Sequence, residues 1–309
     1  MSSAGLSTTA SKKRRIASFH FIGHMRLFLF HSTKTQSSGI WDTLKLLFLY
    51  FLPSRCFQSP GGSQMNKNNQ DTGYLHSVET FGALDGPGIR YVLFLQGCPL
   101  RCGFCHNPDT WQACTGKVVT PEDAFEDILK YKNFISSGGV TLSGGEPLLQ
   151  PEFCQALISL CHSAGIHCAV DTAGSIPLDF CRQAVDAADL LLLDIKALDP
   201  TLCQELTGQD NQNALALLEY CEAAQKAVWI RHVLVPGLTL RRKLLENLAE
   251  FLSGFSCVEQ VELLPFHKMG EYKWEALNLR SPLSGTREPT KAEVAAAKKI
   301  FQSRGLSIH

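Results

Sequence analysis

Six short apolar runs, each followed by a helical pattern, are the feature that most constrains what this chain can fold into. The runs are rich in Val, Leu and Ile without strict alternation, which is typical of strands buried on both faces. Strand–helix alternation repeated about six times predicts a parallel sheet with right-handed crossovers. Six units are fewer than the eight of a closed barrel, so we expect an α/β fold with an open or partial (β/α)6 barrel. The runs are Tyr91–Leu95, Val140–Leu142, His167–Val170, Leu190–Ile195, Val228–Val235 and Val258–Leu264.

Helix signals mark several of the segments between these runs. Thr120 is an expected N-cap with Pro121 in the first turn, and this helix is expected to continue through Phe134. Further helices are expected at Pro151–Ser163, Asn213–Ala224, Arg241–Leu252 and Ala292–Phe301. Because the carboxyl ends of parallel strands share one edge of a sheet, functional side chains should gather where the six runs end.

The first seventy residues differ in composition from the rest. Residues 1–41 contain six Lys and Arg and no Asp or Glu, and the first acid is Asp42. A basic, acid-free, Ser-rich start is typical of an organelle transit peptide, although a tail outside the fold or a true start at Met65 would give the same pattern. We therefore expect a targeting segment and flexible linker over 1–70 and one folded catalytic domain over 71–309. The expected location is a mitochondrion or plastid, with the cytoplasm as the alternative.

Composition excludes several classes of function. Lys+Arg 29 balance Asp+Glu 29, which argues against a generally basic nucleic-acid-binding protein. No run reaches the roughly 18 apolar residues of a membrane span. Twelve cysteines in 309 residues fall below the density of a disulfide scaffold. We expect neither nucleic acid nor a membrane as partner.

Three cysteines fall close together directly after the first of these runs. Cys98, Cys102 and Cys105 are spaced so that one tight loop can surround a small metal centre. Thiolates select zinc or an iron–sulfur cluster. A structural zinc site needs four ligands, for which Cys114 and His106 would have to serve at unusual spacing, and a chance group of buried cysteines is a further alternative. We favour a 4Fe–4S cluster with three protein ligands. Such clusters usually take four thiolates, and a missing fourth thiolate leaves one iron open for a small molecule.

This spacing, with the aromatic Phe104 before the third cysteine, resembles the radical S-adenosylmethionine superfamily, whose fold is a partial (β/α)6 barrel. The resemblance implies that the open iron chelates the amino and carboxylate groups of S-adenosylmethionine. It also implies that electron transfer from the cluster breaks a carbon–sulfur bond and gives a 5′-deoxyadenosyl radical. Cluster and cofactor then carry the chemistry, and no side chain is expected to be a catalytic acid or base.

Polar motifs at the ends of later runs are similar to cofactor-binding motifs of this superfamily. Gly144, Gly145 and Glu146 resemble the GGE motif that binds the methionine ammonium group, although such a turn alone is a weak signal. The resemblance places further residues at the cofactor, namely Phe104, Cys105, His106, Asp194, Ile195, Lys196, Arg231 and His267.

Two of these motifs allow a second interpretation. Asp171, Thr172 and Asp194 match residues that hold a monovalent cation beside the cofactor, with Ala173 standing where Asn is more usual. Arg231 interrupts an apolar run, and a buried arginine lowers stability unless it is paired. Contact with the cofactor and a structural ion pair are nearly equal interpretations of that arginine.

A further motif precedes the first run. Asp85-Gly86-Pro87-Gly88-Ile89-Arg90, read together with 94–98, 106–111, 229–231, 235–237 and 263–267, resembles the glycyl-radical-enzyme activases over about residues 72–309. Many relatives with other targets carry an insert with extra CxxC groups, whereas the segment between Cys105 and Gly144 contains only Cys114. The resemblance therefore indicates the single-cluster type, whose protein substrate is pyruvate formate-lyase.

The resemblance also implies a reaction and its partners. The deoxyadenosyl radical takes a hydrogen atom from one glycine Cα of pyruvate formate-lyase, which leaves a glycyl radical, methionine and 5′-deoxyadenosine. Placement of that glycine matters most, as proximity arguments require. We expect a reduced flavodoxin or ferredoxin as electron donor and a monomeric enzyme. The residues expected to contact the glycine loop are Asp85, Gly86, Pro87, Gly88, Ile89 and Arg90.

Three alternatives stay open on the sequence. The target can be another glycyl radical enzyme. The chain can be an iron–sulfur electron carrier, which needs a fourth cysteine near the cluster, and Cys114 is the close candidate. It can be a zinc-stabilised interaction module, which would be colourless. Release of 5′-deoxyadenosine on reduction separates the activases from the carrier.

Overall fold

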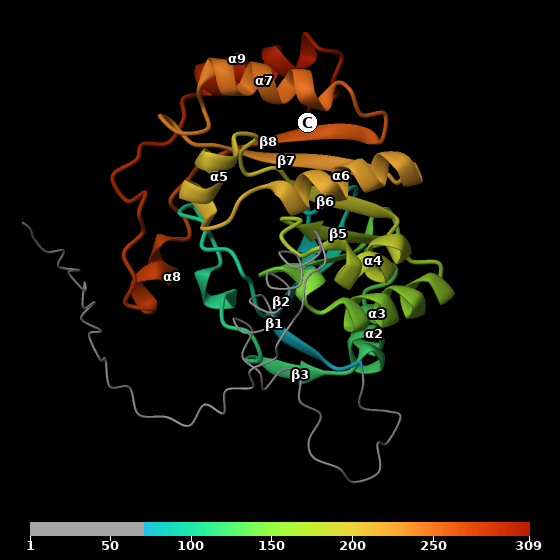
Figure 1. Ribbon diagram of the computed structural model, residues 1–309. Coiled ribbons are helices and arrows are strands. Elements are labelled where there is room, and N and C mark those ends of the chain that lie inside the picture. The colour runs from blue at the N-terminus through green and yellow to red at the C-terminus, as the bar shows by residue number, and fades with distance from the viewer. Residues whose placement is uncertain (1–70) are drawn as a thin grey trace, which may run out of the picture. The chain divides into compact units, whose positions relative to one another are not determined.

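The computed structural model describes residues 71–309, which belong to one compact unit. Their centre is an eight-stranded sheet in the order β3-β1-β2-β4-β5-β6-β7-β8 (Figure 1). Neighbours from β2 to β8 are parallel, whereas β1 pairs antiparallel with β2 and with β3. The strands are β1 Gly73–Gly82, β2 Arg90–Leu95, β3 Lys117–Val119, β4 Gly139–Gly144, β5 Cys168–Thr172, β6 Leu190–Asp194, β7 Val228–Leu234 and β8 Val258–Pro265.

The predicted α/β partial barrel is confirmed. The six apolar runs form β2 and β4 to β8, and the edge strands β3 and β8 are not neighbours in the described sheet, so the barrel stays open. The antiparallel strands β1 and β3 were not predicted. Polar residues such as His76 and Glu79 interrupt the apolar pattern of β1, whose middle is exposed.

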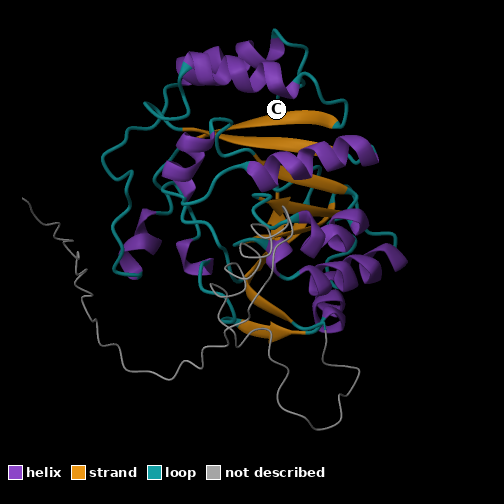
Figure 2. Ribbon diagram, viewed as in Figure 1, coloured by secondary structure: helices purple, strands orange, loops and turns teal. Residues whose placement is uncertain are grey.

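Helices cover the outer side of the sheet (Figure 2). α2 packs on α3 and α3 on α4, while α7 packs on α9 beside β8. The helix predicted through Phe134 ends earlier, at Leu129, and hydrogen-bonded turns follow it. The helices are α2 Pro121–Leu129, α3 Pro151–Ser163, α4 Leu178–Ala187, α5 Pro200–Thr207, α6 Gln212–Ala224, α7 Arg242–Leu252, α8 Glu271–Ala276 and α9 Lys291–Gln302, with short 3-10 turns η2 Pro108–Thr110 and η3 Pro147–Leu149.

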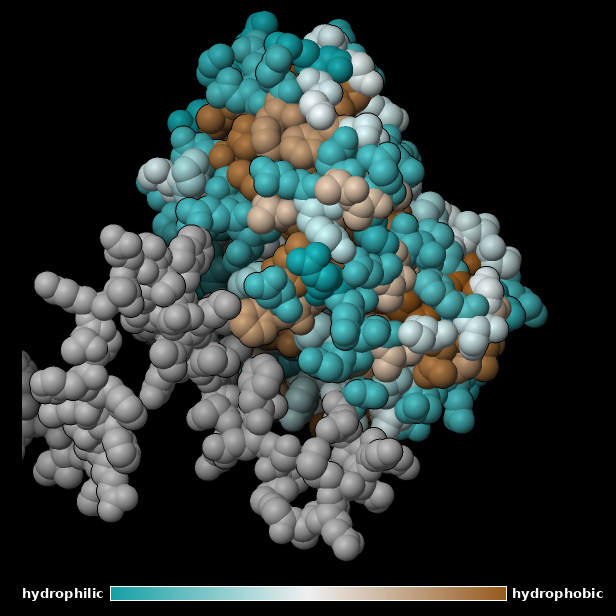
Figure 3. All heavy atoms as spheres, turned by 45° about the vertical axis from the view of Figure 1, so that its right-hand side comes forward, coloured by the Kyte–Doolittle hydropathy of each residue, from teal (hydrophilic) through white to brown (hydrophobic). Residues whose placement is uncertain are grey.

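The surface that Figure 3 presents is mostly hydrophilic, with small separate hydrophobic areas. Within residues 71–309 no helix is long and apolar enough to cross a membrane. The predicted targeting segment and linker, residues 1–70, lie outside the described residues.

The loop between β1 and β2 folds back over the inner face of the sheet. The carbonyl of Asp85 accepts a hydrogen bond from Thr141 Oγ1 on β4 at 2.6 Å. Gly88 has a φ of +70°, and a Cβ there would lie 2.2 Å from the carbonyl oxygen of Ser137, so only glycine fits. This loop therefore packs against β4 and the turn that precedes it.

Candidate active site

The cysteine loop leaves β2 at the carboxyl edge of the sheet and is held from two sides. The N–H of Cys98 donates to the carbonyl of Trp111 at 3.2 Å. On the other side, the N–H of Arg101 donates to the carbonyl of Thr207 at 2.7 Å, in the last turn of α5. Carbonyls at a helix end have no partner within the helix, so this bond satisfies both groups. The protein itself therefore fixes the loop backbone.

The three thiols line a cavity of about 890 Å³ at this edge. A structural zinc site is closed by four protein ligands, whereas three thiolates leave one iron of a 4Fe–4S cluster open. No fourth cysteine of the described chain lines the cavity. The lining therefore fits a cluster held by three cysteines.

The charges around the thiols suit metal binding. Burial raises the pKa of Cys102 to about 12, and the positive charge of Lys196 opposes that rise. Lys196 Nζ lies 2.6 Å from Asp194 Oδ2 at the end of β6 and 5.6 Å from the ring centre of Phe104. A thiol in this setting keeps its proton until a metal replaces it. The donor set therefore fits a thiolate-bound cluster.

The glycines after β4 bring backbone against the cysteine loop. Gly144 has a φ of +114°. A Cβ on Gly145 would lie 2.2 Å from the carbonyl oxygen of Gly97 and 3.2 Å from Cys98 Cβ. Any side chain here would displace the loop. The bare backbone at 144–145 thus forms one wall of the cavity.

Glu146 is fully buried and supports this wall without lining the cavity. Burial raises the pKa of its carboxyl group, and hydrogen bonds oppose that rise. These hydrogen bonds connect the turn after β4 to the end of β5. Glu146 therefore supports the cavity wall from behind. Its donors are Thr172 Oγ1 at 2.7 Å, the N–H of Leu148 at 3.1 Å, the N–H of Ala173 at 3.1 Å and Ser175 Oγ at 3.2 Å.

Charged side chains connect β5, β7 and β8 across the cavity wall. Arg231 Nη1 lies 3.0 Å from Asp171 Oδ2, and its Nε lies 3.3 Å from Glu262 Oε2. Ser143 Oγ on β4 donates to the same Asp171 oxygen at 2.7 Å. Burial lowers the pKa of Arg231, but the surrounding carboxylates outweigh it and raise that pKa above its ordinary value. Arg231 therefore stays charged.

Three buried atoms of this network have no hydrogen-bond partner among the described residues. They are Asp171 Oδ1, Glu262 Oε2 and Arg231 Nε. Buried polar groups are rarely left in this state. Arg231 Nε and Glu262 Oε2 still attract each other as an ion pair at 3.3 Å, so Asp171 Oδ1 is the acceptor left for a ligand with an ammonium or hydroxyl donor. S-adenosylmethionine has such groups, so the residues present fit this cofactor.

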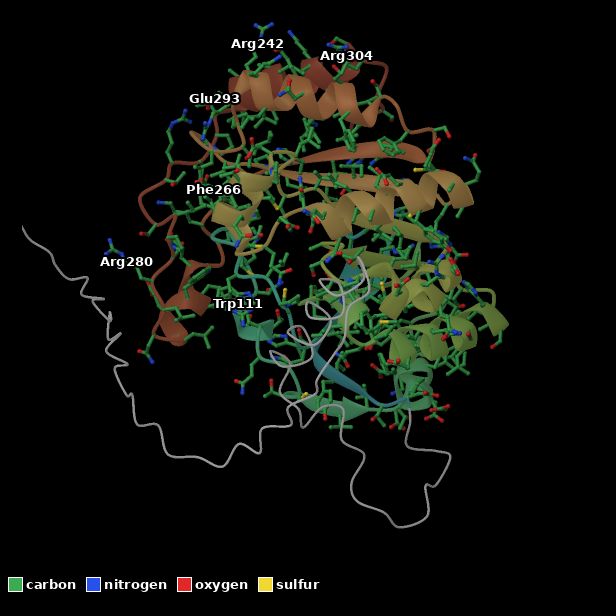
Figure 4. All side chains as sticks on the ribbon, in the orientation of Figure 1. Trp111, Arg242, Phe266, Arg280, Glu293 and Arg304 are labelled. Carbon is green, nitrogen blue, oxygen red and sulfur yellow. The ribbon has the colours of Figure 1, made fainter. Side chains whose placement is uncertain are left out.

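Two histidines stack in the cavity lining. The rings of His106 and His267 have centroids 4.1 Å apart, and His106 Nε2 lies 3.2 Å from the carbonyl oxygen of His267. Burial and the neighbouring His267 lower the pKa of His106. The paired rings offer a flat face to an aromatic ligand. Figure 4 labels Phe266 on the same side of the sheet as Trp111.

Comparison with known proteins decides the family. Residues 92–250 match the family model of the Radical SAM superfamily. The chain is 43% identical over 239 residues to the pyruvate formate-lyase-activating enzyme of Listeria monocytogenes, which covers 75% of this chain and 96% of that relative. The chain belongs to the pyruvate formate-lyase-activating enzyme family of the radical SAM superfamily.

Two further likenesses agree with this. The pyruvate formate-lyase-activating enzyme of Clostridium pasteurianum is 46% identical over 209 residues, covering 67% of this chain and 87% of the relative. The crystal structure of Streptococcus suis SuiB bound to the precursor peptide SuiA superposes with a TM-score of 0.57 at 15% identity, over 87% of this chain and 60% of that one. The second likeness shows the fold alone.

In this activating-enzyme fold, most positions predicted to hold the cofactor line one cavity. Ile195 and Glu146 do not line the cavity. The N–H of Ile195 donates to the carbonyl of Arg231 at 3.0 Å and so supports the backbone of Arg231 from behind. The roles of the lining residues stay predictions. Those that line the cavity are Phe104, Cys105, His106, Gly144, Gly145, Asp194, Lys196, Arg231 and His267.

The predicted cation and glycine-loop residues are divided by the structure. Thr172 Oγ1 donates to Glu146, away from the cavity, whereas Asp171 and Asp194 line it. Of the six residues 85–90, Asp85 lines the cavity, and Arg90 is buried at the opposite end of the sheet. The structure therefore tests neither the predicted cation ligands nor the predicted contacts to the glycine loop.

Sequence reasoning missed three residues of this site. Glu262 interrupts an apolar run in the same way as Arg231, and that shared signal could have paired them. Ser143 directly precedes the glycine turn, and a lone serine there gives no signal of its own. Trp111 was used only as part of a family motif, although it lines the cavity.

Proposed function

We propose that the protein activates pyruvate formate-lyase, with a 4Fe–4S cluster at Cys98, Cys102 and Cys105 and S-adenosylmethionine beside it. When bound, this pair supplies the 5′-deoxyadenosyl radical that takes a hydrogen atom from a glycine Cα of the partner. The cavity is the observation that carries the proposal. Three thiols without a fourth described cysteine line the same cavity as the ion-paired Asp171, Arg231 and Glu262, and Asp171 Oδ1 there has no hydrogen-bond partner among the described residues.

The chain's own residues bind and orient. The bare backbone at 144–145 lets a ligand approach the cysteine loop. Arg231 and Glu262 form an ion pair across β7 and β8, and Asp171 Oδ1 is free to accept a hydrogen bond. Because these atoms lie on parallel strands, the ligand meets a rigid wall, which favours one orientation.

Among residues 85–90, which are predicted to contact the glycine loop of the partner, Asp85 lines the cavity. Leu84 beside it also lines the cavity and has 75% of its surface exposed. We propose that 84–85 meet the glycine loop of the partner. Arg90 then supports this contact from below, through its bond to Thr141.

Four finer features belong to the same proposal. They are a reduced flavodoxin or ferredoxin as donor, a monomeric state, a monovalent cation at Asp171, Thr172 and Asp194, and an organelle location directed by residues 1–70. The acid-free basic composition of 1–41 supports the last. Fusion of residues 1–70 to a fluorescent protein tests it, and a diffuse cytoplasmic signal would contradict it.

The activity is tested with the full chain under anaerobic conditions. The protein is reconstituted with iron and sulfide, reduced, and mixed with S-adenosylmethionine and pyruvate formate-lyase. We expect the electron paramagnetic resonance doublet of a glycyl radical and a matching amount of 5′-deoxyadenosine. Cys102→Ala should abolish both, whereas the matched control Cys221→Ala, at a buried cysteine of α6 away from the cavity, should retain both.

The other outcomes are informative. Deoxyadenosine without a doublet would direct the search to another glycyl radical enzyme. A full cluster that yields neither product would overturn the proposal and leave the iron–sulfur carrier. A colourless protein that holds zinc would leave the interaction module.

A further inference from the structure

The amino edge of the sheet carries three metal-binding side chains that the proposed function does not use. His162 lies in the last turn of α3, Cys168 is the first residue of β5, and Asp189 directly precedes β6. β5 and β6 are parallel neighbours, so their amino ends meet at the edge opposite the cavity. His162, Cys168 and Asp189 do not line that cavity. The group is therefore separate from the candidate active site.

The ligand atoms of these three side chains converge on one point. One imidazole nitrogen, one sulfur and one carboxylate oxygen all lie within 4.8 Å of one another, and within residues 71–309 this is the one group of three that does so. A point between atoms so spaced lies no more than 4.8 Å divided by √3, or about 2.8 Å, from each of them, whereas zinc binds nitrogen, oxygen and sulfur at about 2.0–2.3 Å. Each ligand atom would therefore move by less than about 1 Å to bind zinc.

Hydrogen bonds already orient the carboxylate of this group. The N–H of Cys168 donates to Asp189 Oδ2 at 2.7 Å, and the N–H of Asp189 donates to the carbonyl of Cys168 at 2.9 Å. His162 Nε2 lies 2.9 Å from the same Asp189 oxygen. Carboxylates that bind metals are commonly held by further hydrogen bonds of this kind. The backbone of β5 therefore sets the carboxylate beside the thiol.

Access and charge also suit a metal ion. The side chains of His162 and Asp189 are 40% and 38% exposed, so both can move, whereas Cys168 is fully buried. Binding of a metal releases the thiol proton to water. Zinc with one ionised thiol and one ionised carboxylate carries no net charge. The guanidinium of Arg90, 3.2 Å from the ring of the neighbouring His167, would therefore not repel the occupied site strongly.

A second histidine–aspartate pair shows what the cysteine adds. His76 Nε2 lies 3.0 Å from Asp109 Oδ2, but Lys273 Nζ lies 3.1 Å from that oxygen and already supplies a cation there. The His76 pair belongs to no group of three ligands within the described residues. A partly exposed ion pair alone contributes little to stability. The group at the amino edge differs by its sulfur, and a nitrogen, oxygen and sulfur donor set suits zinc.

We propose that His162, Cys168 and Asp189 bind one zinc ion, with water as the fourth ligand. Three protein ligands leave one position of a tetrahedral zinc ion open, and the exposure of His162 and Asp189 lets water reach it. The ion joins the end of α3 to the amino ends of β5 and β6, so it stabilises the folded chain by mass action. This site is independent of the proposed function, because it shares no residue with the cavity.

The test uses the full chain with its cluster reconstituted, so that the thiols of the cysteine loop are occupied. The anaerobic protein is dialysed to equilibrium against increasing zinc, and iron and zinc are counted by mass spectrometry. We expect zinc binding that saturates at one ion per chain without loss of iron. X-ray absorption at the zinc edge should show a single sulfur neighbour at about 2.3 Å. The melting temperature should rise with the zinc concentration.

Two ligand variants and one control form a matched set. His162→Gln and Asp189→Asn change exposed side chains, so both should fold. Loss of even an outer hydrogen-bond partner weakens metal binding by about 10–100-fold, so loss of either ligand should weaken zinc binding by at least about tenfold. His76→Gln is the control and should bind zinc as the parent does. Cys168→Ser should remove the sulfur neighbour, and if this buried variant does not fold, the two exposed variants decide.

Four results would overturn the inference. The first is a parent protein that binds no zinc. The second is zinc with three sulfur neighbours and a loss of iron, which would place the ion in the cysteine loop. The third is zinc without a sulfur neighbour, which would place it on surface side chains. The fourth is unchanged zinc affinity in His162→Gln.

Failure of the proposed function would be seen separately. A chain that assembles no cluster would refute that function. The difference in zinc affinity between His162→Gln and His76→Gln would still decide on the zinc site, because both variants leave the cysteine loop unchanged.

Discussion

Two buried arginines at opposite ends of one sheet have opposite environments. Arg231, at the carboxyl end, lies within 3.3 Å of two carboxylates, and these raise its pKa above the ordinary value although burial lowers it. Arg90, at the amino end, is completely buried, and burial lowers its pKa to about 10. Its partners are Thr141 Oγ1 at 2.9 Å, the Val140 carbonyl and the His167 ring at 3.2 Å. Within residues 71–309, Arg90 forms no ion pair.

The difference distinguishes Arg231, a residue of the candidate binding site, from Arg90, a residue that supports the fold. The hydrogen-bonding groups of Arg90 are matched by neutral acceptors, so nothing is left for a ligand. The network of Arg231 leaves Asp171 Oδ1 without a hydrogen-bond partner among the described residues, on the wall of the cavity. A buried charge that is paired but not fully hydrogen-bonded is poorly explained by stability alone. It is what a binding surface for a polar cofactor requires.

The largest expected effect comes from Arg231→Met, which would leave two carboxylates buried without their cation. Removal of one partner of a buried ion pair lowers stability by about 3–5 kcal/mol. We expect a lower melting temperature and loss of S-adenosylmethionine binding in calorimetry. Adding Asp171→Asn should restore part of the stability and none of the binding. Normal cofactor binding by Arg231→Met would break the comparison.

A smaller effect is expected for Arg90→Met. The substitution removes the donors to the Val140 carbonyl and Thr141, and an unsatisfied buried group lowers stability by about 1–3 kcal/mol. It leaves no carboxylate without a cation. Urea unfolding should show this loss, while the dissociation constant for S-adenosylmethionine should stay within twofold of the parent value. A large change in that constant would place Arg90 in the site after all.

The smallest effect, and one of opposite sign, is expected for Asp85→Asn. Burial, followed by the charge of Asp171, raises the pKa of Asp85 above its unfolded value. The contribution of this group to stability is therefore present below its unfolded pKa of 3.8 and is lost as the pH rises through the folded pKa. At pH 8 the variant should have a higher free energy of unfolding than the parent, by less than about 1 kcal/mol because the carboxylate is partly solvated.

Two measurements sharpen this last prediction. The stability difference should shrink as the pH is lowered towards 4, and a difference independent of pH would contradict the assignment to the carboxylate. If Asp85 meets the glycine loop, the more stable variant should also form less glycyl radical. Such a trade of stability for activity is typical of functional sites.

The apolar runs predicted the parallel strands well, because buried strands must be apolar whatever surrounds them. The pattern failed for β1 and β3, since edge strands carry polar residues that resemble a loop. At the site, Cys98, Cys102 and Cys105 were found from spacing alone, because one short loop brings them together. Glu146 was predicted at the cofactor, and the structure shows it buried beneath the turn, which its sequence position could not reveal.

The sequence by itself determined the six parallel strands, the cysteine loop and the glycine turn, since each depends on residues close together in the chain. The tertiary structure alone decided how distant residues meet. The register of β7 and β8 sets Arg231 directly opposite Glu262, and the packing of α8 brings Trp274 to the Cys105 carbonyl. The strand register depends on the whole sheet, because a shift of one residue would turn Arg231 or Glu262 to the other face. The position of α8 depends on tertiary packing, because its residues lie far along the chain from the cysteine loop.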